Sequence, residues 1–495
     1  MAEKSDKARC VLTLPLLTEP WQEHIIEKRF RIMEHLKNSL IALELRKLKN
    51  MQRTKQYRQL EAEISNAPKE NRKTLYKKRN ELLKNAGFSE FAFIDDMTKM
   101  QKHFVEHIAT QIAHKSASDV WNSFEKVLFN TGRKIHFIRR GSLSSIACKK
   151  DGNGMRFRNG MLHWNGGQCK NKVKLELRVA CPKTPYECAM LEKKIKYERI
   201  IRKWVKTRYK YYVQFTLDGN AVPKPRKTGT GRVGIDIGPS SIAIASSQEV
   251  RLMELADKVN QNHLRKVALQ QKMDRSRRAT NPDNFNENKT IRRGVKLSWH
   301  YSKHYQKLRG QVRELERKNA DIRKYQHTCL ANYILSLGTE VYIEQMNFKG
   351  LQARAKETTY NKNGRANRKK RFGKSIANRA PAMLVTILET KLKSYAGTEF
   401  HKVNTWSYRA SQYDHITDTY TKKLLRQRWA ELGNGDRIQR DLYSAFLLMN
   451  SQPSLQSTDR ERCSKTYSQF KSLHDQEIYR LQQTPERHLS SFGIA

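Results

Sequence analysis

Residues 231–248, GRVGIDIGPSSIAIASSQ, place two short apolar runs on either side of a Gly-Pro turn. Runs of four to eight residues that are rich in β-branched side chains and bounded by turn residues are typical of buried strands. One carboxylate, Asp236, interrupts the first run. We therefore expect two adjacent strands, at 232–237 and 241–246, with an acid beside the first.

The residues that follow continue an α/β pattern. A long, highly charged helical section over 252–337 stops at Gly338, and the short strand TEVYIE comes directly after it. A very basic loop then precedes a helix that begins at Pro381, the strand EFHKVN and the apolar helix RDLYSAFLLMN. Beyond residue 451 the chain becomes polar, and we expect it to fray.

The first half of the chain is organised differently. We expect a strand at 10–17, successive amphipathic helices over 21–113, and a short helix at 116–129. Strand-like pieces separated by Gly and Asn then predict a small β-barrel or sandwich, with a basic helix at 186–204 and a strong strand at 209–217 before a Pro-, Gly- and Lys-rich linker.

The charge balance identifies the kind of partner. The chain has 97 Lys and Arg against 48 Asp and Glu, a formal charge of +49, which favours a polyanion, with nucleic acid as the leading candidate. A membrane surface could also attract this charge, but no segment approaches the roughly 20 apolar residues that a bilayer-spanning helix needs. The seven cysteines form no C-x-x-C pair, and the N-terminal residues have no signal-peptide pattern, so we expect an intracellular protein with reduced thiols.

Three acids lie at the edges of apolar elements in the second half: Asp236, Glu344 at the end of TEVYIE, and Asp441 at the start of RDLYSAFLL. If the two strands are neighbours and the last helix packs on their sheet, the three carboxylates converge. Such hard oxygen ligands suit Mg²⁺ or Mn²⁺, and two such ions promote phosphodiester hydrolysis. The small residues Gly234 and Ala445 would allow the helix to approach the sheet. The pattern therefore predicts a metal-dependent nuclease.

Each acid also has a purely structural interpretation. Asp441 could cap its helix, Asp236 could form an Asx turn before Gly-Pro, and Glu344 could end an exposed strand. Taken singly, these interpretations are favoured; taken in order and with these flanking residues, the acids favour a metal site.

The ordered set GIDIGPSSIAIAS, VYIEQMNFKGL and QRDLYSAFLL resembles the three RuvC motifs of the TnpB family of transposon-associated RNA-guided nucleases, and of the miniature type V CRISPR effectors related to them. The similarity is best over 195–450. The resemblance implies an α+β multidomain protein with a helical recognition lobe, a β-barrel-like wedge domain and an RNase H-like (RuvC) α/β nuclease domain. It implies Asp236, Glu344 and Asp441 as catalytic residues and as ligands of two Mg²⁺ or Mn²⁺ ions.

The resemblance also implies domain boundaries and partners. We expect the domains to be a first wedge strand at 1–20, the recognition domain at 21–114, the wedge domain at 115–220, a linker at 221–231, the RuvC domain at 232–410, an insert at 411–436, the third-motif helix at 437–450 and a polar tail at 451–495. The expected partners are a guide RNA, target double-stranded DNA and its displaced single strand. We expect a monomer on one guide, in the bacterial or archaeal cytoplasm and associated with the nucleoid.

One departure from the family concerns the insert. Relatives carry a zinc ribbon with two C-x-x-C pairs there, whereas residues 411–436 contain no cysteine, so zinc is not expected. We expect the insert to fold around an apolar set, with Asp414 and His415 as polar neighbours of the cleft; the set is Tyr413, Tyr420, Leu424, Leu425, Trp429 and Leu432.

Aromatic residues add a second hypothesis about nucleic acid. Base stacking is a possible role for several of them, although aromatic side chains at strand or helix spacing are more often part of the core. The candidates are Trp121, Trp164, Trp204, Trp299, Trp406, Tyr211 and Tyr212.

Two other functions stay open. One is an inert RNA-guided DNA-binding repressor or RNA scaffold protein, against which the three acids argue. The other is an RNA-independent RNase H-like nuclease, for which the large basic first half is superfluous.

Overall fold

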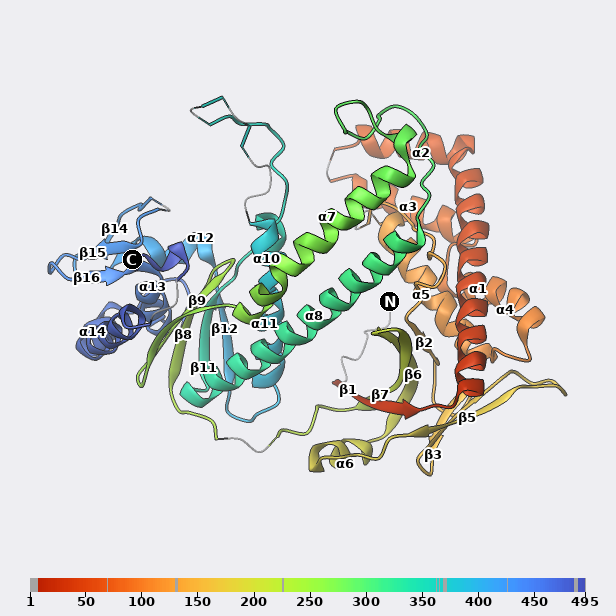
Figure 1. Cartoon of the computed structure of the whole chain (residues 1–495), viewed down its shortest axis with the longest axis horizontal. Coiled ribbons are helices and arrows are strands. Elements are labelled where there is room, and N and C mark those ends of the chain that lie inside the picture. The colour runs from red at the N-terminus through yellow and green to blue at the C-terminus, as the bar shows by residue number, and fades with distance from the viewer. Residues whose placement is uncertain are drawn as a thin grey trace. The chain divides into compact units, whose positions relative to one another are not determined.

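The computed structural model divides the chain into two compact units, Met1–Val222 and Pro223–Ala495 (Figure 1). The division lies within the Pro- and Gly-rich stretch at 221–231. The residues that the structure describes are 8–68, 70–129, 132–224, 227–361, 363–364, 366–367, 372–424, 426–484 and 488–494. No helix among them combines the length and the apolar character needed to cross a membrane.

The first unit packs helices against an antiparallel sheet. Its longest helix, α1, buries Ile26, Phe30, Met33, Leu36 and Leu40, which recur at helical spacing on one side. The helices are α1 (Pro20–Gln52), α2 (Lys55–Asn66), α3 (Arg72–Asn85), α4 (Glu90–Gln101), α5 (Thr110–Leu128) and α6 (Pro185–Leu191). The strands are β1 (Arg9–Leu17), β2 (Ser145–Ala147), β3 (Met155–Arg158), β4 (Met161–Asn165), β5 (Lys174–Val179), β6 (Ile195–Val205) and β7 (Arg208–Asp218).

The strands of the first unit form one open sheet, in the order β2-β6-β7-β1-β5-β4-β3. Strand β1 joins its two halves, because Leu12 lies opposite Phe215 of β7 while Leu16 lies opposite Val179 of β5. Among the described residues β2 and β3 are edge strands that do not pair with each other. The expected barrel is therefore not closed.

Strand β6 corrects the expectation of a basic helix at 186–204. Only Pro185–Leu191 is helical, and Ile195–Val205 pairs with β7 instead. The inward-facing residues of β6 include Glu198, Ile200 and Arg202, of which two are charged. Arg202 is neutralised by Glu27 and donates to the carbonyl of Leu143 over 2.8 Å. Because charged residues occupy the buried face, the alternation typical of a strand is absent from the hydrophobic pattern.

The second unit is built on a mixed five-stranded sheet in the order β10-β9-β8-β11-β12. Strands β8, β9 and β10 are antiparallel, whereas β11 and β12 run parallel to β8. The strands of this sheet are β8 (Arg232–Ile237), β9 (Ser241–Ser246), β10 (Val250–Glu254), β11 (Glu340–Glu344) and β12 (Glu399–Val403). Since β8, β11 and β12 are parallel, their carboxyl ends lie at one edge of the sheet.

Helices cover both faces of this sheet (Figure 1). The helices of the unit are α7 (His263–Thr280), α8 (Lys303–Leu337), α9 (Phe348–Leu351), α10 (Gly373–Arg379), α11 (Pro381–Leu392), α12 (Thr405–Tyr408), α13 (Arg440–Met449) and α14 (Arg460–Gln482). Ile235 and Ile343 pack with α8 and α11 on one face. Tyr342 and Val403 pack with α13 and α14 on the other.

The polar segment after residue 451 contains a packed helix, α14 (Arg460–Gln482), where we expected a frayed tail. Helix α14 begins after Asp459, whose side chain accepts a hydrogen bond from the backbone N–H of Arg462 over 3.0 Å. It buries Cys463, Phe470, Ile478 and Leu481, and the ring of Phe470 stacks on that of Phe446 in α13 at 4.3 Å. A narrow apolar stripe within a polar segment therefore completes the second core.

Candidate active site

Asp236 and Glu344 lie on neighbouring strands at the same edge of the sheet. Ile235 of β8 is paired with Ile343 of β11, and each acid is the next residue of its strand. Side chains alternate along a strand, so the acids face away from Ile235 and Ile343 and toward the α13 face. Convergence of the acids required the strands of Asp236 and Glu344 to be neighbours, and β8 and β11 are paired in the sheet.

Helix α13 reaches the sheet through two small residues. A Cβ on Gly234 would stand 1.9 Å from the carbonyl oxygen of Ala445, so the helix backbone lies directly on β8. Gln439, not Asp441, caps the helix, because its side-chain oxygen accepts from the backbone N–H of Leu442 over 2.8 Å. Asp441 lies in the first turn and is free of the capping role.

The charges of the three acids interact. Burial raises the pKa of Asp236 well above its usual range, and the negative charges of Asp441 and Glu344 raise that pKa further. The positive charge of Arg440 and a hydrogen bond from Ser444 act in the opposite direction. Burial also raises the pKa of Glu344 to about 7. The folded chain thus gathers three carboxylates whose negative charge is only partly compensated.

Arg440 is the cation that partly compensates this charge. Its Nη2 donates to Oδ1 of Asp441 over 3.1 Å, and Nη1 donates to the carbonyl of Gln427 over 3.1 Å. The sequence analysis did not single out Arg440. Its position directly before Asp441, in a chain stretch expected to hold metal ligands, is the signal that could have identified it.

The donor set suits a divalent cation chemically, since three carboxylates offer only hard oxygen ligands. Among the described residues no three His, Cys, Asp or Glu side chains converge closely enough to hold an ion as they stand. Asp441 is instead paired with Arg440.

The insert before α13 folds as two small hairpins, β13 (Tyr413–Asp414) with β14 (Thr419–Tyr420) and β15 (Trp429–Glu431) with β16 (Arg437–Gln439). Tyr413 and Leu432 are buried as expected, whereas Tyr420 and Leu424 are exposed, and Leu425 lies outside the described residues.

His415 is fully buried rather than beside a cleft. It forms a hydrogen bond with the hydroxyl of Tyr443 through Nδ1 at 2.7 Å. This contact fixes the insert to α13.

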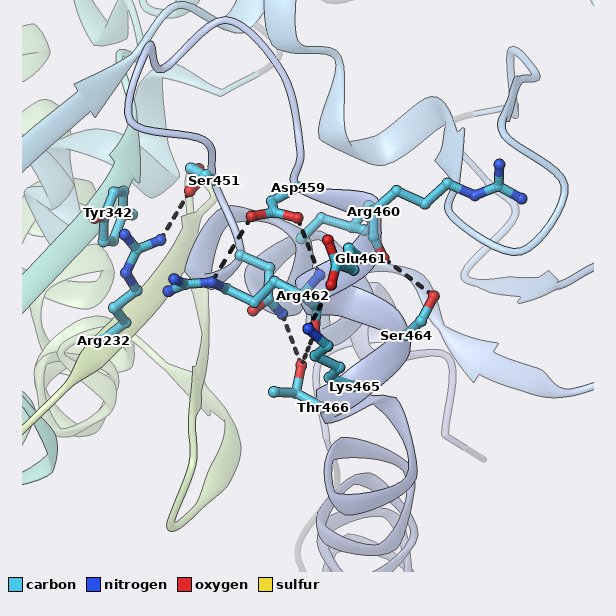
Figure 2. Close-up of polar contacts among 12 residues, drawn as sticks. Arg232, Tyr342, Ser451, Asp459, Arg460, Glu461, Arg462, Ser464, Lys465 and Thr466 are labelled. Carbon is cyan, nitrogen blue, oxygen red and sulfur yellow. Dashed lines mark hydrogen bonds and ion pairs between the residues drawn. The ribbon is translucent and has the colours of Figure 1, made fainter.

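A pocket of about 560 Å³ lies at the start of β8, the opposite end of the strand from Asp236. Figure 2 shows polar contacts among residues of this region. Arg232 donates to the carbonyl of Ser451 over 2.8 Å, and Lys465 pairs with Glu461 (Figure 2). Arg232 also pairs with Glu340. These basic groups are neutralised by neighbouring acids. The pocket contains none of the three acids of the candidate site.

Comparisons with known proteins yield structural matches only. No family model and no curated protein matches the chain. The chain is similar to a protein in the cryo-EM structure of a Cas12f1–sgRNA–target DNA complex, with a TM-score of 0.46 and 12% identity over 90% of this chain and 99% of that chain. A CRISPR-Cas12f ternary complex gives a TM-score of 0.25 and 14% identity, over 91% and 100% of the two chains.

A third similar structure is that of the mini-RNA-guided endonuclease CRISPR-Cas phi3, with a TM-score of 0.30 and 11% identity over 90% of this chain and 92% of that chain.

Proposed function

We propose that the chain is an RNA-guided DNA endonuclease that hydrolyses phosphodiester bonds at Asp236, Glu344 and Asp441. The observation that carries this proposal is the approach of three carboxylates from β8, β11 and α13, two of which raise the pKa of the third. A protein gains nothing in stability from such repulsion, so a functional cation is the simplest reason for it.

The proposed chemistry follows from this donor set. Asp236, Glu344 and Asp441 would hold Mg²⁺ or Mn²⁺, which when bound stabilises the attacking and leaving oxygens of a phosphodiester. The Ser444 hydroxyl donates to the carbonyl of Arg440 over 3.0 Å and lies close enough to Asp236 to oppose the rise in the pKa of that carboxyl. The Gly234 and Ala445 contact holds α13 at a set depth, and with it the position of Asp441.

Guide RNA and target DNA are proposed as the partners. The formal charge of +49 supports binding to nucleic acid, and the motifs at 234–246, 341–351 and 439–448 support guidance by RNA. In this proposal pairing of guide to target reads the sequence, while the protein recognises a short adjacent motif and the shape of the heteroduplex. The first unit would supply the recognition domain (21–114) and the wedge domain (1–20 and 115–220). The insert at 411–436 would load the strand to be cut.

One observation favours a second candidate, an inert RNA-guided DNA-binding protein. The Asp441 carboxylate is paired with Arg440, and no described trio of ligands converges. The two candidates share every partner and differ only in whether DNA is cut in the presence of Mg²⁺.

The experiment that tests the proposed function begins with the RNA that the full-length protein carries. We expect sequencing of this RNA to give one dominant structured species ending in a variable segment. A DNA duplex matched to that segment should be bound, and it should be cleaved only with Mg²⁺ or Mn²⁺. A mixture of ordinary cellular RNAs would contradict guidance, and binding without cleavage would favour the inert protein.

A further inference from the structure

Trp406 differs from every other tryptophan of the chain in its exposure. Its side chain is 91% exposed, whereas Trp164 is fully buried and Trp21 is 53% exposed. The remaining tryptophans have partners: Trp121 packs on Phe93, Trp204 on Tyr209, Trp299 on Phe285, and Trp429 donates to the carbonyl of Gly493. Trp406 has no ring partner among the described residues. The ring of Trp406 therefore offers an apolar, flat face on which a ligand can stack.

The position of Trp406 connects it to the carboxylates. Val403, the last residue of β12, lies opposite Glu344, and its carbonyl accepts from the backbone N–H of Gln345 over 2.8 Å. The hydroxyl of Thr405 donates to the carbonyl of Gln345 over 3.3 Å. Helix α12, which carries Trp406, therefore begins at the same edge of the sheet as Asp236 and Glu344.

The backbone that carries Trp406 is held firmly on both sides. The side-chain oxygen of Asn404 accepts from the backbone N–H of Trp406 over 2.9 Å. Two residues later the buried Tyr408 donates its hydroxyl to the carbonyl of Leu447 in α13 over 2.7 Å, and it accepts from Ser451 and Thr458. These hydrogen bonds hold the backbone of Trp406 in place and connect it to α13, the helix that carries Asp441.

The residues beyond Trp406 favour a nucleic-acid strand as its ligand. Arg409 has a left-handed backbone, with φ of 50°, and its guanidinium lies over the ring of Tyr420 at 4.6 Å. Tyr420 is itself 41% exposed. Exposed aromatic rings combined with cations, beside a site suited to phosphodiester chemistry, are the elements by which proteins hold single strands.

We propose that Trp406 stacks on one base of single-stranded DNA as the strand enters the carboxylate site. This inference rests on the proposed function and adds to it a positioning residue for the substrate. Stacking on an aromatic ring is tolerant of sequence, as a guided nuclease requires, because every base has a flat face. Trp406 makes no contribution of charge, so its effect is separable from that of the basic surface.

The test is a double-mutant cycle between Trp406 and the DNA. Full-length Asp236→Ala protein, in which cutting is blocked, is titrated with labelled DNA of about 12 nucleotides, within the range that single-strand binding sites cover. Each base is replaced in turn by an abasic site. At one position we expect affinity to fall by roughly 5- to 150-fold, the equivalent of about 1–3 kcal/mol for one stacked base.

In protein that also carries Trp406→Ala, the same abasic site should cause no further loss of DNA affinity. In protein that carries Trp406→Phe instead, the abasic site should again lower the affinity, although by less than in the parent. The dependence of DNA affinity on salt should be the same whether residue 406 is Trp, Ala or Phe, because none of these side chains carries a charge. Tyr479→Ala removes a 64%-exposed aromatic ring from α14 and serves as the matched control, which we expect to bind like the parent.

Absence of coupling between Trp406 and any base overturns the inference. So does a change in the amount of bound RNA, or in the oligomeric state measured by light scattering, because either would place RNA or a second copy of the chain on this ring. Cleavage of DNA by the parent protein is measured separately. If the parent cleaves DNA but Trp406 shows no coupling to any base, only the inference about Trp406 is wrong. If Trp406 is coupled to a base but the parent does not cleave DNA, only the proposed nuclease activity is wrong.

Discussion

Gly234 of β8 and Ala445 of α13 are in backbone contact, with 1.9 Å between the position of a Cβ on residue 234 and the carbonyl oxygen of Ala445. A second clash would occur with the backbone nitrogen of Met449 at 2.4 Å. This contact fixes the depth of the helix that carries Asp441. The geometry of the three acids therefore depends on the absence of one methyl group.

Gly234→Ala should destabilise the second unit by about 1–3 kcal/mol or more, because the methyl group can be accommodated only by moving α13. Urea denaturation measures this change, and cleavage should be lost as Asp441 moves. Gly310→Ala is the control: this glycine lies in α8 with no atom within 4 Å of an added Cβ, so the same change should stabilise by about 0.5–1 kcal/mol. Equal stability of the two variants would contradict the contact.

Glu477 ties α14 to the sheet. This carboxylate is 2% exposed, accepts from the backbone N–H of Leu252 over 2.9 Å, and pairs with Arg251 and Arg480. Glu477→Ala should therefore cost about 1–3 kcal/mol in the free energy of unfolding, because it leaves the buried backbone N–H of Leu252 without its acceptor. The variant also removes the counter-charge of Arg251 and Arg480, which are both partly exposed.

The matched control for Glu477→Ala is Glu461→Ala, which removes an exposed carboxylate from the same helix. Both members of its pair with Lys465 are exposed, so solvent screens their attraction and we expect the variant to unfold like the parent. If denaturant titration gives both variants the stability of the parent, the residues after 451 do not pack as described.

The pKa values at the site predict how stability depends on pH in the absence of metal. The folded-state pKa values of Glu344, about 7, and of Asp236 lie above their unfolded values of about 4. The folded chain thus binds more protons than the unfolded chain over this interval. Its free energy of unfolding should fall as pH rises from about 5 to about 8.

Urea titrations in EDTA at several pH values measure this dependence, and Asp236→Asn isolates the contribution of the site. The difference in stability between parent and Asp236→Asn should grow in favour of the variant as pH rises. Adding Mg²⁺ at the highest pH should stabilise the parent more than the variant. A pH-independent difference, or an equal response to Mg²⁺, would contradict the electrostatic description.

Much of the second unit could be predicted from sequence because each element carries its own signal. The apolar runs around Asp236 and Glu344 read as buried strands, and the small residues Gly234 and Ala445 indicated that the last helix would lie close to the sheet. The structure places β8 beside β11 and packs α13 against them, which brings the charges of Glu344 and Asp441 within reach of Asp236. Among the described residues the three carboxylates do not converge closely enough to hold an ion as they stand.

The elements that could not be predicted depend on partners distant in sequence. Glu198 and Arg202 make the buried face of β6 look polar, and only pairing with β7 reveals a strand. Residues 133–140, RKIHFIRR, are one of the strand-like pieces of the first half, but no strand forms there. Ile138 instead exchanges hydrogen bonds with the side chain of Asn38 in α1 at 2.8 and 2.9 Å. The position of the Arg440 guanidinium could not be predicted either, because it depends on a hydrogen bond to the carbonyl of Gln427, which only the folded chain brings close.

The most direct measurement is single-turnover cleavage of a labelled DNA duplex by the protein loaded with its own RNA. The parent should cut with Mg²⁺ and not with EDTA, and Asp236→Ala should lower the rate by roughly 10³-fold or more, the equivalent of the several kcal/mol that metal catalysis supplies. The Asp236→Ala variant should still bind the duplex. Asp283→Ala, which removes an exposed carboxylate between α7 and α8, should cut normally. Cleavage by Asp236→Ala at the parent rate would contradict the assignment of the site.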